Sequence, residues 1–309
     1  MRQERTEQRM PASVEAFLLH RLRSLEGAED GRQRAALDSE LGAFYQSAGR
    51  YDAALRAFQE AGEEIGRTLG RACPEYAAAL LGSAEACRGM KDAPRAAALL
   101  EEALELCRRA DGRNGGLYPG VLNALSAVRR EEGRLEEAAA CLEESLGWLE
   151  SAPEGRWREI AVTCNNLTAL WHDAGDDQEA LRCANRALQA CERLPTREQA
   201  RCTDVLNSLA GFLYAGGDCR RALGLYRRSA RRIRRFRGEN EEYGVVCQNI
   251  RWVCERLGDR KGAAAALAEA ERVYRRLLGP DHERTRMVAE DLARLRAPRG
   301  AALPEDGAP

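Results

Sequence analysis

The chain has 309 residues with 48 basic and 49 acidic side chains, so its formal net charge is −1 and bulk electrostatics favour no particular partner. Hydrophobic residues make up 44% of the sequence and aromatic residues only 6%, which favours closely packed helices over a β-sandwich. No run approaches the roughly 18 apolar residues of a membrane-spanning helix, so we expect no membrane partner.

The 11 cysteines are odd in number, and none lies in a C-x-x-C pair. They occur inside helical phrases such as EACRG and VTCNN, where they can serve as small buried apolar residues. The first ten residues, MRQERTEQRM, are charged and lack the apolar centre of a secretory signal. These features predict free cysteines in a reducing, cytoplasmic compartment.

In chain order, the first predicted element is a helix at about residues 12–26, within an N-terminal segment of residues 1–34. The sequence PASVEAFLLHRLRSLEG carries many charges beside its apolar stripe. Because terminal units of a repeat array need a polar outer face, we expect this helix to cap the first repeat.

Residues 35–281 contain one phrase six times. GRYDAALRAFQEA begins at Gly49, and its relatives begin at Gly133, Gly175 and Gly217, at multiples of 42 residues. The second copy begins at Lys91 in place of glycine, and the sixth begins at Gly258, one residue early. A fixed period of this size predicts a solenoid of six repeats of about 42 residues.

Each repeat is predicted to hold two antiparallel helices. In the first repeat, apolar residues at Leu37, Leu41, Phe44 and Tyr45 form one helical stripe, and Gly49 ends that helix. Small residues recur on the facing sides of the two helices, as in Gly42, Ala84, Ser126, Thr168 and Ala210 of the first helices and Ala54, Ala96, Ala138, Ala180, Ala222 and Ala263 of the second. In the sixth repeat either Arg251 or Trp252 occupies the small position.

After the last repeat, residues 282–297 predict a C-terminal capping helix, and residues 298–309 a disordered tail. The prediction is therefore an all-α protein of about 14 helices without a sheet.

This pattern resembles the tetratricopeptide repeat, on the small residue Gly42, the aromatic Tyr45, and the later Ala54, Phe58 and Ala61. The period of 42 instead of 34 is similar to the longer repeats of kinesin-light-chain-like proteins, and so is the linker phrase YRRLLGPDHERT at 274–285. The resemblance implies an α-solenoid of helix-turn-helix repeats that forms a right-handed superhelix. The pattern departs from the family at Lys91, at repeat six, and where Cys87 and Arg129 replace the aromatic residue.

Motifs that carry catalysis or cofactor binding are absent from the sequence. The three histidines, His20, His172 and His282, are far apart on the repeat grid, and no metalloprotease, phosphate-loop or nucleophile-elbow motif occurs. Cys247 and Cys254 share a helical face but lack further ligands at metal spacing, so packing is the better interpretation. We therefore expect no enzyme activity, no metal and no cofactor.

An arginine run, CRRALGLYRRSARRIRRFRGE at residues 219–239, is either a phosphate-binding surface or a solvated helix exterior. We expect Glu239, Glu241 and Glu242 to neutralise it in part. Nucleic acid is disfavoured as a partner because no aromatic residues are interleaved for base stacking. The helix predicted at 136–150 is acidic by contrast, so the outer surface is polarised.

An asparagine recurs at exact spacings of 42 in four first helices, and seven residues further on, the same face carries a second polar row. The resemblance implies that first helices line a concave groove, where a similar asparagine grips a peptide backbone. The candidate binding residues are Asn123, Asn165, Asn207, Asn249, Arg88, Arg130, His172, Tyr214 and Arg256. The alternative is that these amides bond a neighbouring helix and hold the curvature.

The sequence thus favours a non-enzymatic scaffold or adaptor that binds a peptide or protein segment in the groove. The alternative function is a peptide-sensing regulator that acts through partner proteins.

Overall fold

A computed structural model describes residues 9–25, 30–109, 116–152, 155–199 and 202–297. These residues form fourteen helices of 13 residues or more, one four-residue helix, and no strand. The predicted all-α architecture is confirmed. The predicted tail, 298–309, lies outside the described residues, as does residue 26 at the end of the predicted first helix.

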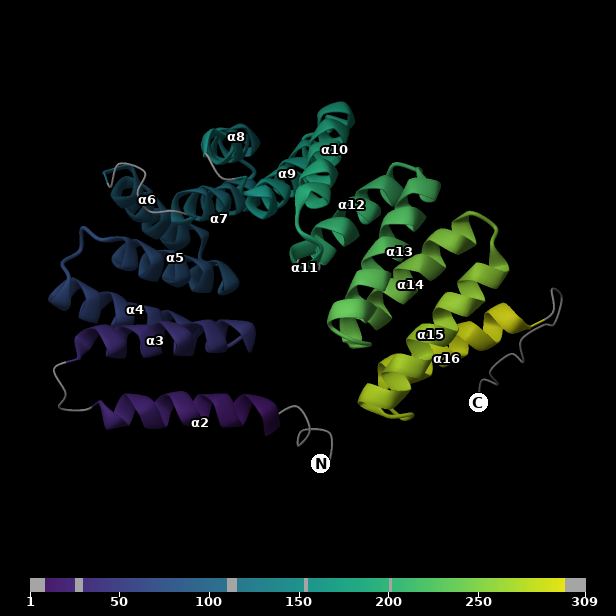
Figure 1. The fold of residues 1–309 in the computed structure, drawn as a ribbon, viewed down its shortest axis with the longest axis horizontal. Coiled ribbons are helices and arrows are strands. Elements are labelled where there is room, and N and C mark those ends of the chain that lie inside the picture. Colours follow the sequence, from purple (N-terminus) through teal and green to yellow (C-terminus); the bar gives the residue numbers. More distant parts are fainter. Residues whose placement is uncertain (1–8, 26–29, 110–115, 153–154, 200–201, 298–309) are drawn as a thin grey trace, which may run out of the picture. The chain divides into compact units, whose positions relative to one another are not determined.

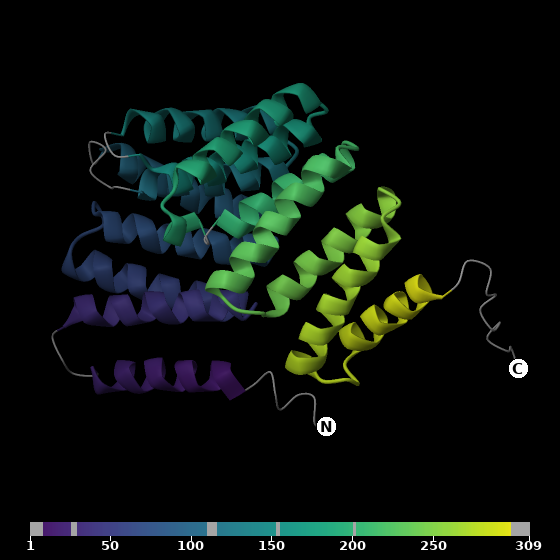
Figure 2. The same ribbon diagram turned by 45° about the vertical axis from the view of Figure 1, so that its right-hand side comes forward.

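The chain divides into two compact units, residues 1–156 (unit 1) and 157–309 (unit 2). Figures 1 and 2 show that each unit is a stack of antiparallel helix pairs in chain order. Unit 1 contains α2 (Arg9–Ser24), α3 (Gly31–Ser47), α4 (Tyr51–Thr68), α5 (Pro74–Gly89), α6 (Ala93–Arg109), α7 (Leu117–Glu131) and α8 (Leu135–Ser151). Unit 2 contains α9 (Trp157–Asp173), α10 (Asp177–Arg193), α11 (Thr196–Gln199), α12 (Thr203–Ala215), α13 (Cys219–Phe236), α14 (Glu241–Arg256), α15 (Arg260–Leu278) and α16 (Glu283–Arg296).

The corner between the two helices of each repeat has a left-handed residue. Gly49, Gly133, Gly175, Gly217 and Gly258 have φ between 71° and 88°. Lys91 has φ 63° at the corner of the second repeat, so the backbone keeps the same turn although the side chain adds strain. The departure at Lys91 therefore leaves the fold unchanged.

Close helix packing depends on the small residues. The six alanines of the second helices, at 54, 96, 138, 180, 222 and 263, are all 0% exposed. The ring of Phe58 lies between Gly42 and Gly82, because a Cβ atom at either glycine would come within 2.9 Å or 2.6 Å of a ring carbon. Any larger residue at these two glycines would push α3 or α5 away from α4.

Repeat six is shifted by one residue from α14 onward. The buried residues of α14 match those of α12 at a spacing of 41, whereas α12 matches α9 at 42. Arg251, only 6% exposed, therefore occupies the small position held by Ala210 in repeat five, and Trp252 is 51% exposed. Arg251 is neutralised by Glu255 and Asp291, both at 2.9 Å.

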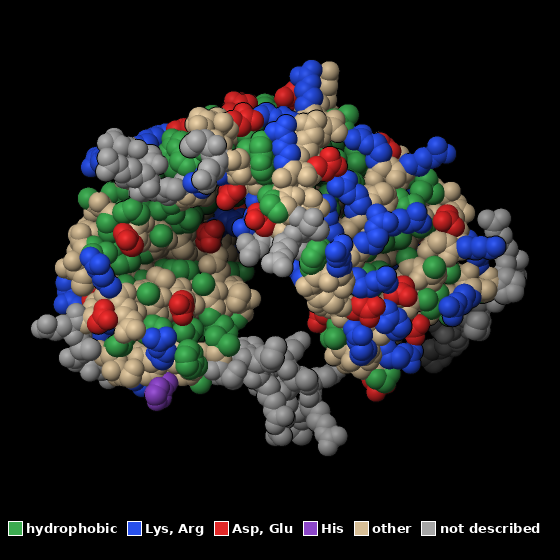
Figure 3. Space-filling model, viewed as in Figure 1, with side chains coloured by type: hydrophobic (Ala, Val, Ile, Leu, Met, Phe, Trp, Pro, Cys, Tyr) green, Lys and Arg blue, Asp and Glu red, His purple; other side chains and the backbone are tan. Residues whose placement is uncertain are grey.

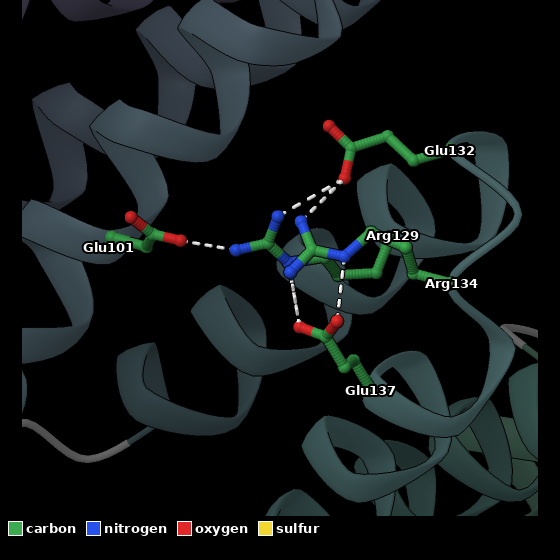
Figure 4. A network of polar contacts seen from close by, with 5 residues as sticks. All are labelled: Glu101, Arg129, Glu132, Arg134 and Glu137. Carbon is green, nitrogen blue, oxygen red and sulfur yellow. Dashed lines mark hydrogen bonds and ion pairs between the residues drawn. The ribbon is translucent and has the colours of Figure 1, made fainter.

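Arg129, which replaces an aromatic residue, is accommodated in a similar way in unit 1. It forms ion pairs with Glu101 and with Glu132 (3.1 Å), and it lies 3.8 Å from Glu137 (Figure 4). Arg134 pairs with Glu132 (3.1 Å) and Glu137 (2.5 Å). This network joins α6, α7 and α8.

All 11 cysteines are free, and nine of them are buried. Burial raises the pKa of several thiols, including Cys87, Cys247 and Cys254. The thiols therefore pack as small apolar groups, as predicted.

Candidate functional site

The asparagine of repeat three is bonded inside the protein. The Nδ2 of Asn123, in α7, donates to the carbonyl oxygen of Pro119 at 2.7 Å and to the Oγ of Ser145, in α8, at 3.1 Å. Ser145 is fully buried. At this position the amide joins the two helices of one repeat, which is the structural role that the sequence left open.

Repeat five has the same two residue types 84 positions later, Asn207 in α12 and Ser229 in α13. Here the Oδ1 of Asn207 and the Oγ of Ser229 are both buried without a hydrogen-bond partner in the described part of the chain. A buried polar atom without a partner is costly, so this pair lacks the hydrogen bond that joins the two helices of repeat three.

Repeat four has lost the hydroxyl altogether, since the residue equivalent to Ser145 is Ala187, which is 0% exposed. Asn165 is half-buried in α9, and nothing in the described residues ties its amide to α10. Asn165 and Asn207, like Asn249 of repeat six, therefore have amides that form no hydrogen bond with the described residues.

In repeat six the one-residue shift places Gln248, not Asn249, at the position equivalent to Asn207. The Nε2 of Gln248 donates to the hydroxyl of Tyr274 at 2.8 Å and joins α14 to α15. Asn249 lies one position away, where it lines a cavity. The residue 42 positions after Asn207 is therefore Asn249, whereas the residue that is structurally equivalent to Asn207 is Gln248.

This cavity has a volume of about 320 Å³ and lies between α12, α13 and α14 of unit 2. Its lining residues are Tyr214, Tyr226, Asn249, Trp252 and Val253. Three aromatic rings and one amide surround it, so it suits an apolar or aromatic side chain beside a backbone group. Two of its residues, Tyr214 and Asn249, were predicted from the sequence.

Trp252 was not predicted as a site residue. Its indole is half exposed, and the guanidinium carbon of Arg251 lies 3.3 Å from the ring centroid. The sequence did place a large residue, Arg251 or Trp252, at the small position of repeat six. The repeat spacing alone did not show which of the two is buried and which is exposed.

The second predicted row makes contacts along the repeats. Arg88 forms an ion pair with Glu131 at 3.1 Å in unit 1. In unit 2, His172 contacts the ring of Phe212 edge-on at 5.4 Å and its Nδ1 lies 2.9 Å from Asp177.

At the rim of the cavity, the Nη1 of Arg256 donates to the carbonyl oxygen of Tyr214 at 3.0 Å, and its guanidinium lies over the Tyr214 ring at 4.9 Å. The side chain of Arg256 is exposed beside the aromatic cavity. Arg130 is exposed near the end of α7, in unit 1.

Among the described residues, no group of three or more His, Cys, Asp or Glu side chains is arranged to hold a metal ion. None of the described helices has the length and the hydropathy that a membrane-spanning segment needs.

Comparison with known families gives one match: a model described as tetratricopeptide repeat fits residues 33–109 and 119–193. No curated protein matches the sequence.

Among solved structures, the chain is similar to BtubC (BKLC) from P. vanneervenii, with 22% identity, a TM-score of 0.61, and coverage of 84% of this chain and 97% of that one. It is similar to a Rap protein complexed with Competence and Sporulation Factor, with 15% identity, a TM-score of 0.59, and coverage of 89% and 80%. It is also similar to the TPR-like repeats assigned to a kinesin light chain from Podosopora anserina, with 18% identity, a TM-score of 0.51, and coverage of 66% and 96%. At these identities the likeness concerns the fold.

Proposed function

The chain is a tetratricopeptide repeat protein, and from that premise we propose that it is a cytoplasmic, non-enzymatic interaction module that binds a peptide segment on the first helices of unit 2. The observation that carries the proposal is the half-buried side chain of Asn207 in α12, whose amide forms no hydrogen bond with the described residues. Asn165 supplies a second unused amide in α9.

An amide suits this role because it offers both donors and an acceptor to an extended peptide backbone. The cavity lined by Tyr214, Trp252 and Asn249 would take one apolar or aromatic side chain of the same peptide. Arg256 at the rim and His172 on α9 would meet carboxylates. Asn123, Arg88 and Arg130 of unit 1 remain predicted contacts, although the amide of Asn123 already has internal partners.

A second candidate function is a peptide-sensing regulator that acts through partner proteins. Its support is the similarity to the Rap protein, which was solved with Competence and Sporulation Factor. The two candidates share one ligand class and differ in consequence, since a sensor must change the affinity for a second protein when the peptide binds.

The test begins with a displayed random peptide library, from which a binding peptide is selected on the whole protein. Its dissociation constant is then measured for Asn165→Ala with Asn207→Ala. Two ligand hydrogen bonds at about 0.5–1.5 kcal/mol each predict binding roughly 5- to 150-fold weaker. The melting temperature should stay nearly unchanged, because neither amide has a bond to lose.

Ser208→Ala is the matched control, since Ser208 is exposed on α12 beside Asn207. It should bind like the parent protein. A double variant that binds the selected peptide with unchanged affinity would contradict the proposal. So would one that loses stability and binding together.

A further inference from the structure

A second surface of unit 2, which shares no lining residue with the aromatic cavity, holds three arginines without partners among the described residues. Arg227, Arg231 and Arg234 of α13 line a groove of about 190 Å³ whose remaining lining residues are Ala230, Tyr243 and Ile250. The three arginines are exposed and form no hydrogen bond or ion pair with the described residues. Figure 3 shows basic side chains gathered over the region of α13–α15.

Other arginines of the same helix are already engaged. Arg221 and Arg228 have acidic partners in Asp218 and Glu192, and Arg232 donates to Gln199. Arg237, the residue that follows α13, pairs with Glu242. Five arginines of α13 form no hydrogen bond or ion pair with the described residues. Three of them line the groove, and the other two are Arg220 and Arg235.

The expected neutralisation by Glu239 and Glu241 is wrong. Glu239 pairs with Arg272 at 2.7 Å and Arg276 at 3.1 Å, which lowers its pKa to about 2. Glu241 pairs with Arg284 of α16 at 3.0 Å. Of the three glutamates, only Glu242 pairs with a member of the arginine run, Arg237. The lining residues of the groove include no Asp or Glu.

We propose that the groove formed by Arg227, Arg231, Arg234, Tyr243 and Ile250 binds an acidic helical segment of a partner protein. The spacing of i, i+4 and i+7 puts the guanidinium groups on one face, with about 6 Å and 4.5 Å of helix rise between them. Carboxylates one turn apart on a facing helix match this spacing, and guanidinium groups bind carboxylates through paired hydrogen bonds. The apolar floor of Ala230 and Ile250 takes a leucine from the same face.

Nucleic acid fits this surface less well. A protein that binds a polyanion strongly makes about 6–10 phosphate contacts, whereas only three unpaired arginines line this groove. The floor of the groove is aliphatic apart from Tyr243, which is only 6% exposed and offers no stacking platform.

The experiment uses the whole protein and a fluorescein-labelled, alanine-based helical peptide with Glu at i, i+3 and i+7 and Leu on the same face. The control peptide carries Gln at the Glu positions. We expect the acidic peptide to bind with a dissociation constant that rises with salt, and the Gln peptide to bind at least about tenfold less tightly.

Arg231→Gln with Arg234→Gln should weaken binding of the acidic peptide about 2- to 30-fold. Arg220→Gln with Arg235→Gln is the matched control, because it removes the same charge from exposed positions of α13 that do not line the groove. The control should bind like the parent protein. Arg227→Gln alone gives a second variant should the double variant fold poorly.

Three results would overturn the proposal: no saturable binding of the acidic peptide at low salt, equal weakening by the groove and control variants, or tighter binding of a labelled single-stranded DNA than of the peptide. The Asn165→Ala and Asn207→Ala variant should leave this binding unchanged, which separates the groove from the proposed peptide site.

Discussion

Repeat three in unit 1 and repeat five in unit 2 carry the same polar pair and use it differently. In α7 and α8, Asn123 donates to the buried hydroxyl of Ser145. In α12 and α13, the buried oxygen atoms of Asn207 and Ser229 have no partner in the part of the chain that the structure describes. Among the charged residues, Arg129 of repeat three lies in an ion-pair network, whereas Arg227, Arg231 and Arg234 of repeat five have no partner among the described residues.

The comparison teaches that equal sequence positions need not have equal roles in a repeat protein. The backbone frame of both repeats is the same, with Gly133 and Gly217 in the left-handed conformation at their corners. What differs is whether side chains satisfy one another within the repeat. A repeat that leaves polar groups unsatisfied pays in stability and is the better candidate for binding.

The largest expected effect concerns Asp38 in unit 1, a polar residue that is buried without an ion-pair partner among the described residues. Its carboxyl is 3% exposed at a position held by leucine or cysteine in the other repeats, and burial, aided by Glu60, raises its pKa from 3.8 to about 6. Because the pKa of Asp38 is higher in the folded chain than in the unfolded chain, the protonated carboxyl stabilises the fold. That stability is complete below about pH 4 and is lost as pH rises through about 6, a change of up to about 3 kcal/mol.

Asp38→Asn should abolish this pH-dependent change in stability. Urea unfolding between pH 4 and pH 8 should show the variant more stable than the parent at pH 8, with the difference vanishing near pH 4. A difference that is the same at every pH would show that Asp38 is not desolvated in the folded protein.

A smaller effect separates the two serines. Ser145→Ala should cost about 0.5–1.5 kcal/mol of unfolding free energy, because it removes a hydrogen bond from Asn123. Ser229→Ala should be neutral or slightly stabilising, since its hydroxyl has no partner and Ala187 already occupies the equivalent position of repeat four. Both changes in unfolding free energy are measured as shifts of the denaturant midpoint at an unchanged m-value. Equal losses at the two positions would refute the division between the repeats.

The smallest effect tests whether the corners are equivalent. Lys91→Gly should stabilise the protein by about 0.5–1 kcal/mol, because a non-glycine residue at φ 63° is strained. Lys91→Ala should give no gain, since it keeps the Cβ atom. A melting temperature unchanged by the glycine would mean that the Lys91 corner is not strained.

Much of the fold could be predicted because periodic spacing reports directly on packing. The alanines at the six facing positions and the glycines at the corners stand at the predicted places. The register of repeat six could not be predicted, because the missing residue lies in the α13–α14 connection and spacing does not locate it. As a result, Asn249 was placed with Asn207, whereas Gln248 holds that position.

The candidate site was predictable only in part. Tyr214 and Asn249 line the cavity as residues of the predicted set, but Trp252 joins them only through the shifted register. Asn123 and Asn207 differ in whether the amide bonds to the serine of the facing helix, which identical residue types at equal spacing do not reveal.

The central claim is that Asn123 is used within the protein and Asn207 is not, and one pair of unfolding measurements tests it most directly. Asn123→Ala should lower the free energy of unfolding by about 1–3 kcal/mol, because it leaves the buried Ser145 hydroxyl without its donor. Asn207→Ala should change it by less than about 0.5 kcal/mol, as expected where no hydrogen bond is lost. A loss at Asn207 as large as that at Asn123 would contradict the account.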